Sequence, residues 1–149
     1  MRNTITSLFF GLLGLFLAAC PSSEQHRGHQ HAKPSEATGP VAELESQVLA
    51  VHDSIMARMG DLMDLQKEVA AKAQQSEGEA KETGNTVGLH LQKADEAMTD
   101  WMHQYKGDTL NVLDQEQALA YLRQQQLKVN DLSRLMQKTL REAENYVEK

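Results

Sequence analysis

Apolar residues recur three and four positions apart through most of the chain beyond residue 40, a spacing that places them on one side of a helix. The first such run predicts a helix over residues 41–75, with an apolar stripe at Val41, Leu44, Val48, His52, Ile55, Met59, Leu62, Met63 and Val69. The second predicts a helix over residues 86–105, with Val87, Leu91, Ala94, Met98, Trp101, Met102 and Tyr105 on its buried face. The third begins near residue 114 and buries Tyr121, Leu122, Val129, Leu132, Met136, Leu140 and Val147.

Residues that start or stop helices separate these three segments. Gly39 and Pro40 suit an N-cap and a first turn, and the polar run SEGEAKETGN over 76–85 predicts a turn. Lys106-Gly107-Asp108 ends the second helix, and the spacing from Asp114 to Gln117 fits a capping box for the third. The sequence therefore predicts an all-α fold, an antiparallel three-helix bundle over residues 41–149.

Gly60 leaves the helix count open, because glycine inside a helix costs up to about 1 kcal/mol relative to alanine. One interpretation is a tolerated weak spot in the helix, or a break with Asp61 capping a new helix, so that the bundle has four helices. The other is a close approach of backbone or ligand beside the methionines.

The first forty residues predict the location of the protein. Leu8 to Ala18 form an apolar run that is too short for a membrane span and is typical of a signal peptide. Leu17-Ala18-Ala19-Cys20 resembles the lipobox of bacterial lipoprotein signal peptides. The resemblance implies that residues 1–19 are removed, that Cys20 is lipidated, and that the lipid anchors the protein to the periplasmic side of the inner or outer membrane of a bacterial cell envelope.

Residues 20–40 contain every proline of the chain and no periodic apolar pattern, so we expect a flexible tether. Within it His26, His29 and His31 form an H-x-x-H-x-H cluster. Neutral imidazoles this close together can chelate Cu(II), Zn(II) or Ni(II), although the segment offers no further ligand to fix a geometry. A linker metal site and a merely solvated linker both remain open.

Charge and motif content exclude several classes of protein. The chain has 15 basic and 21 acidic residues, and loss of residues 1–19 removes one arginine, which leaves a formal charge of −7. An acidic protein does not suit nucleic acid. The sequence has no glycine-rich phosphate loop, nucleophile elbow or H-E-x-x-H motif, and its single cysteine is the predicted lipid site. We therefore expect no enzymatic activity.

Methionine spacing raises a metal hypothesis. A hairpin folded about residues 81 and 82 would set Met59 and Met63 at the height of Met98 and Met102. Trp101, His103 and Tyr121 would lie nearby, and His52 would lie more than a turn away. Methionine is an adaptable core filler, so the cluster can be purely structural. Thioethers also select Cu(I), so the six Met and His side chains are candidate copper ligands.

Two blocks carry a family resemblance. HDSIMARMGDLMDLQ, residues 52–66, and ADEAMTDWMHQY, residues 94–105, resemble segments of small uncharacterised bacterial lipoproteins that are sometimes labelled viral A-type inclusion protein-like. The resemblance implies a helical fold and an envelope location, and no activity. Two functions remain open: a non-enzymatic helical binding module for an envelope protein partner, with no certain cofactor, or a Cu(I)-binding lipoprotein.

Overall fold

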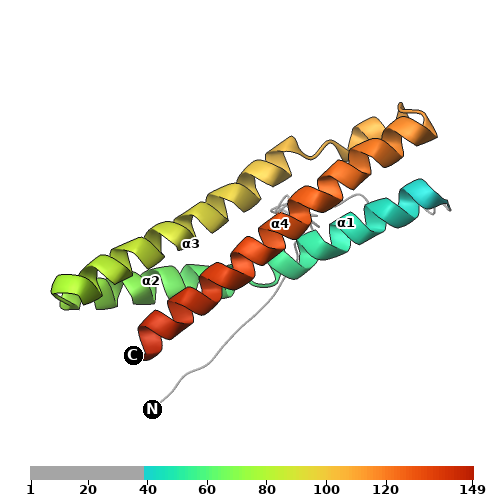
Figure 1. Cartoon of the computed structure of the whole chain (residues 1–149). Coiled ribbons are helices and arrows are strands. Elements are labelled where there is room, and N and C mark those ends of the chain that lie inside the picture. Colours follow the sequence, from blue (N-terminus) through green and yellow to red (C-terminus); the bar gives the residue numbers. More distant parts are fainter. Residues whose placement is uncertain (1–38) are drawn as a thin grey trace, which may run out of the picture. The chain divides into compact units, whose positions relative to one another are not determined.

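The computed structural model describes residues 39–149 as four α-helices and one short 3₁₀ helix (Figure 1). Their bounds are Pro40–Met56 for α1, Met59–Gln75 for α2, Gly78–Gln104 for α3, Gly107–Asn111 for η1 and Gln115–Glu148 for α4. Helices α1 and α2 follow one another in one direction, α3 returns beside them, and α4 runs along both. The predicted all-α antiparallel bundle is confirmed, with the first of its three rods broken into two helices. The predicted signal peptide, Cys20, His26, His29 and His31 lie outside the described residues.

The long helix α4 holds the bundle together, because it packs against α1, α2 and α3, while α2 packs against α3. The largest fully buried side chains come from all four helices and include Val48, Leu62, Leu91, Met98, Leu122 and Leu140. They occupy the predicted apolar stripes, so hydrophobic burial accounts for the pairing of the rods. Over the described range, none of the helices has the length and apolarity to cross a membrane.

The predicted beginnings of the first and last helices are confirmed. Gly39 is the N-cap of α1, at a φ of 141° that suits glycine, and Pro40 follows it in the first turn. Asp114 is the N-cap of α4, and its carboxylate accepts a hydrogen bond of 2.9 Å from the backbone N–H of Gln117. Local capping therefore fixes where these two helices start.

The break in the first rod lies at Ala57 and Arg58 rather than at Gly60. Arg58 is the N-cap of α2, so the prediction that Asp61 caps this helix is wrong; instead Asp61 accepts a 2.6 Å hydrogen bond from Arg58 Nε. A Cβ added to Gly60 would meet nothing within 4 Å, so no part of the described chain approaches it closely. Met63, predicted to lie in the buried stripe, has 54% of its surface exposed.

The turn between α2 and α3 is much shorter than predicted. Only Ser76 and Glu77 separate the helices, and α3 begins at Gly78, whose φ is 59°. Gly84, expected in the turn, is instead buried inside α3. A Cβ on it would lie 2.7 Å from Ala73 Cβ and closer still to the hydroxyl of Tyr146. The glycine lets three helices approach one another, and this packing outweighs its poor helix propensity.

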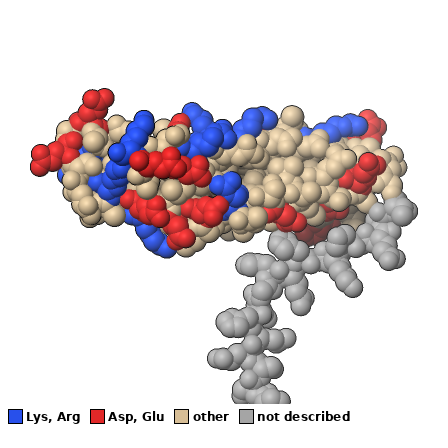
Figure 2. Space-filling view, turned by 90° about the horizontal axis from the view of Figure 1, so that it is seen from below, with Lys and Arg blue, Asp and Glu red and all other residues tan. Residues whose placement is uncertain are grey.

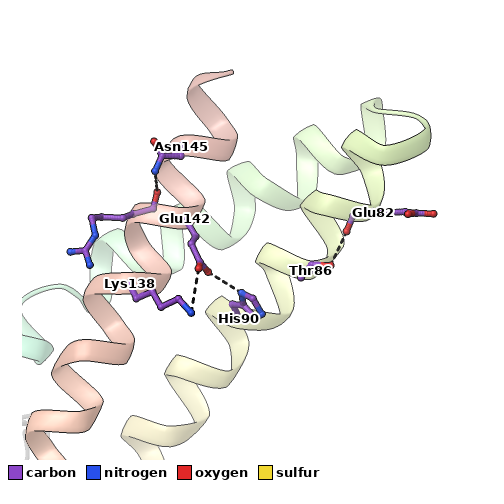
Figure 3. A network of polar contacts seen from close by, with 7 residues as sticks. Glu82, Thr86, His90, Lys138, Glu142 and Asn145 are labelled. Carbon is purple, nitrogen blue, oxygen red and sulfur yellow. Dashed lines mark hydrogen bonds and ion pairs between the residues drawn. The ribbon is translucent and has the colours of Figure 1, made fainter.

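Polar contacts join α3 to α4 at the surface. Glu142 Oε2 lies 2.9 Å from His90 Nδ1, and Glu142 Oε1 lies 3.7 Å from Lys138 Nζ (Figure 3). Nearer the C-terminus, the Tyr146 hydroxyl donates to the Ala80 carbonyl over 3.1 Å. The His90–Glu142 and Tyr146–Ala80 contacts are consistent with one register of α3 against α4.

Charged side chains are unevenly spread over the bundle. Helix α1 has three acidic residues and no lysine or arginine. On the face drawn in Figure 2, Lys, Arg, Asp and Glu side chains crowd the end formed by the α2–α3 turn, and uncharged surface predominates toward the end where α1 begins. The end of the bundle where α1 begins is therefore the better place to look for an apolar or uncharged binding surface.

Candidate functional site

A row of aromatic side chains joins α1 to α3 and α4, running from near the middle of the bundle toward the end where α1 begins. The ring centroids of His52 and Trp101 are 5.5 Å apart, those of Trp101 and Tyr105 are 5.1 Å apart and stacked, and those of Tyr105 and Tyr121 are 6.1 Å apart. His52 and Trp101 are almost completely buried, at 4% and 5% exposed. Because α1 packs mainly on α4, these large rings fill the space between α1 and α3.

Hydrogen bonds hold the ends of this row. The Tyr105 hydroxyl donates to Glu45 Oε1 over 3.3 Å, and the Tyr121 hydroxyl accepts from the Lys106 backbone N–H over 2.6 Å. Burial raises the pKa of Tyr105 above its ordinary value, and the negative charge of Glu45 raises it further. The Tyr105 phenol therefore remains a neutral donor at physiological pH.

Two buried polar atoms at this level have no hydrogen-bond partner within the described chain: Trp101 Nε1, a donor, and Gln125 Oε1, an acceptor. Trp101 precedes Tyr105 by one turn, and Gln125 follows Tyr121 by one turn. Since α3 and α4 are antiparallel and the two tyrosine rings are neighbours, Trp101 and Gln125 lie opposite one another. The layer of the bundle that contains Trp101 and Gln125 therefore has two buried polar atoms in a mostly apolar core.

Three methionines lie close to the same level as the His52–Trp101 pair. The contact between His52 and Trp101 fixes the antiparallel register of α1 and α3. In that register Met98 and Met102 of α3 lie opposite positions 55 and 51 of α1, next to Met56 and His52. The four residues therefore fall within about 8 Å along the bundle axis, at 1.5 Å per residue.

The same side chains lie on the facing sides of the two helices. His52 and Met56 are one turn apart on α1, and His52 contacts α3. Gly84 of α3 packs against Ala73 of the first rod. Met102 is five whole turns beyond Gly84, so it lies on the same face of α3, the face toward the first rod. We use the name methionine seam for this α1–α3 contact, made of His52, Met56, Met98, Trp101 and Met102.

The residues of the methionine seam differ in how far they are exposed to solvent. Met98 is completely buried, whereas Met56 and Met102 are 39% and 38% exposed. The seam thus has a buried floor of Met98, His52 and Trp101, and two flexible thioether side chains at its rim. His52 Nδ1 lies 2.9 Å from the carboxylate of Asp53, which holds the imidazole in place.

Only part of the predicted methionine cluster is brought together. The α2–α3 turn is centred at residues 76 and 77 instead of 81 and 82, which moves the partner of any α2 residue by ten positions, about 15 Å. Met59 is half-buried opposite position 94, about 6 Å along the axis from Met98, and Met63 is exposed opposite position 90. His103 is also exposed. Of the predicted ligands, Met98, Met102 and His52 lie at a similar height along the bundle. Met56 lies at that height too, and its four-residue spacing from His52 was the available signal.

A second surface feature lies between α2 and α3, where a groove of about 440 Å³ opens beside small residues of both helices. Ala70, Ala73, Gly84 and Gly88 line it, and Leu89 at its edge is 55% exposed. The groove lies toward the α2–α3 turn, far along the bundle from the aromatic row. It has no titratable side chain except Lys81.

Comparison with protein-family models, curated proteins and solved structures found no match. Within residues 39–149, no three His, Cys, Asp or Glu side chains gather at one point as they do in zinc and calcium centres. The candidate site therefore rests on the geometry of the seam itself.

Proposed function

We propose that the chain is a lipid-anchored, non-enzymatic protein of a bacterial envelope, and that its helical bundle acts by binding another envelope component at the methionine seam. One observation carries this proposal: Met56 and Met102 are both more than one-third exposed, and they belong to the two helices that the buried His52–Trp101 contact joins. Neighbouring exposed apolar side chains are typical of binding surfaces, and flexible methionines adapt to what they bind.

Lipid attachment at Cys20 would supply the location. The tether expected for residues 20–40 would, as a flexible chain of roughly twenty residues, separate its ends by about 25 Å, which is enough to hold the bundle clear of the lipid headgroups. Helix α1 starts at Pro40, and the seam residues His52 and Met56 lie 12 and 16 residues further along it, about 18 and 24 Å at 1.5 Å per residue. The anchor would therefore hold the seam within a limited distance of the membrane.

The anchor is tested by Cys20→Ser. We expect the parent protein to partition into the detergent phase of a Triton X-114 separation and the variant to move to the aqueous phase, with unchanged helicity by circular dichroism. A variant that still partitions into detergent would show that Cys20 is not the lipid site.

The binding surface is tested by site-specific photocrosslinking in the expressing cell. A benzophenone amino acid replaces Met56 or Met102 at the seam, Leu89 at the groove, or the highly exposed Arg134 of α4 as control. We expect adducts with one envelope component from positions 56 and 102 that exceed those from position 134. Adducts from position 89 alone would transfer the binding surface to the groove, and adducts from no position above the control would contradict the proposal.

A further inference from the structure

We infer that the methionine seam binds one Cu(I) ion, with the thioethers of Met56, Met98 and Met102 and the imidazole of His52 as ligands and the indole of Trp101 beside the ion. This inference rests on the proposed function, because it names the ligand of the same surface. It differs from the set expected from the sequence in excluding Met59, Met63 and His103 and in including Met56.

The ligand chemistry favours a soft ion. Thioether sulfur is uncharged and polarisable, and it selects Cu(I) over Zn(II), Mg(II) or Ca(II), which prefer harder or charged ligands. Met98 and Met102 are four residues apart on α3, and His52 and Met56 are four residues apart on α1. Residues at this spacing have Cβ atoms about 5–6 Å apart, so each helix presents two ligands that can meet at one ion.

The geometry gives the ion both an entrance and an enclosed position. Met56 and Met102 are the exposed rim, and Met98 and His52 are the buried floor. Met56 is also the last residue of α1, directly before the break at Ala57, so its backbone can adjust without bending a continuous helix. The unbranched thioether arms, each with three rotatable bonds, can supply the remaining movement.

Two neighbours suit a metal-binding imidazole and a cation. His52 Nδ1 lies 2.9 Å from Asp53 Oδ1, and a carboxylate beside the imidazole is common among metal-binding histidines. Trp101 lies against the same imidazole, with centroids 5.5 Å apart. A cation near the face of an indole is attracted by the ring quadrupole. Trp101 is the only tryptophan of the chain, so its fluorescence reports on this position alone.

The test uses the mature chain from residue 20 with Cys20→Ser and with His26, His29 and His31 changed to Gln, which removes the thiol and the linker imidazoles. Ag(I), a redox-stable substitute for Cu(I), is titrated while Trp101 fluorescence is recorded. In parallel, the chain competes for Cu(I) with the coloured chelator bicinchoninate under reducing conditions. We expect fluorescence quenching that saturates at one ion per chain, and a matching loss of chelator colour.

Matched leucine pairs locate the site. Met56→Leu with Met102→Leu removes two seam thioethers, and Met63→Leu with Met136→Leu removes two elsewhere. Leucine nearly conserves volume, so both pairs should keep the helical circular dichroism spectrum. We expect the seam pair to bind Ag(I) and Cu(I) more than about tenfold more weakly than the parent, and the control pair to match it. Equal losses in both pairs, or none in either, would overturn the assignment.

The outcomes also separate this inference from the proposed function. If the parent takes no Cu(I) from bicinchoninate while positions 56 and 102 still give photocrosslinks, the copper inference is wrong and the binding surface stands. If both experiments are negative, both are wrong. If copper binds at the seam without any crosslinked protein, the metal is the ligand and the protein partner is dismissed.

Discussion

Replacing Gly84 and Gly88 of α3 by alanine, one at a time, should have opposite effects on stability. The two glycines are one turn apart in the same helix, so they share a helix-propensity gain of about 0.5–1 kcal/mol on replacement by alanine. They differ in surroundings. A Cβ at Gly88 meets nothing within 4 Å, whereas one at Gly84 lies 2.7 Å from Ala73 Cβ and also overlaps the Tyr146 ring. Gly88→Ala is therefore the matched control.

The cost at Gly84 follows from what must move. Ala73 Cβ is bonded directly to the α2 backbone and cannot rotate away, so α2 and α3 must separate by several tenths of an ångström. Overpacking of this kind typically costs about 1–3 kcal/mol. Displacing Tyr146 also disrupts its 3.1 Å hydrogen bond to the Ala80 carbonyl, which contributes about 1 kcal/mol. After the propensity gain, we expect Gly84→Ala to destabilise by about 2 kcal/mol and Gly88→Ala to stabilise by about 0.5–1 kcal/mol.

Urea unfolding followed by circular dichroism at 222 nm measures both variants against the parent, with the denaturant slope checked for constancy. A double variant, Gly84→Ala with Tyr146→Phe, separates the two clashes. Removing the hydroxyl should make the double variant more stable than the sum of the single effects predicts, by more than about 0.5 kcal/mol. If Gly84→Ala proves as stable as Gly88→Ala, the close packing of α2, α3 and α4 at this point is refuted.

Three further predictions concern polar groups. Because the pKa of Tyr105 is raised in the fold and an unfolded tyrosine ionises near 10, the folded state holds the proton more tightly, so stability should fall as the pH rises above about 10. Ultraviolet titration should show one late-ionising tyrosine that Tyr105→Phe removes; its persistence in that variant would contradict the assignment. Glu142→Gln should cost less than about 1 kcal/mol in a thermal melt, because its contact with His90 is partly solvent-exposed, and a larger loss would mean that the pair is more important than its exposure indicates. Gln125→Leu should leave stability unchanged or raise it by about 1 kcal/mol, since it deletes a buried acceptor without a partner, whereas a marked destabilisation would show that the amide is satisfied.

Helix type and most of the buried face were predictable from the sequence because both depend on local spacing. Val48, Leu91 and Val129 recur at helical intervals with apolar neighbours, and each is completely buried. The N-cap Asp114 was likewise readable, since its partner lies three residues away. These features need no knowledge of the rest of the chain.

The start of α3 and the composition of the seam were not predictable in the same way. The run from residue 76 to 85 is polar and contains two glycines, which locally favours a turn. Its helical state depends on packing of Gly84 against Tyr146, sixty-two positions away in the sequence. The centre of the turn lies five residues earlier than predicted, which changes the residue opposite any given position by ten. The prediction therefore placed Met98 and Met102 opposite α2, whereas in the structure they lie opposite α1. A small error in one turn therefore changed which methionines were expected to meet.

The break at Ala57 and Arg58 also bears on how the bundle opens. Helix α1 is joined to α2 by a two-residue turn and packs mainly on α4, so it can detach without unwinding α2 or separating α2 from α3. Local unfolding of one terminal helix requires less free energy than global unfolding. Amide hydrogens of α1 should then exchange with solvent faster than those in the middle of α3, and each such opening would uncover Met98 and Trp101. Access to the floor of the seam would be governed by the detachment rate of a single seventeen-residue segment.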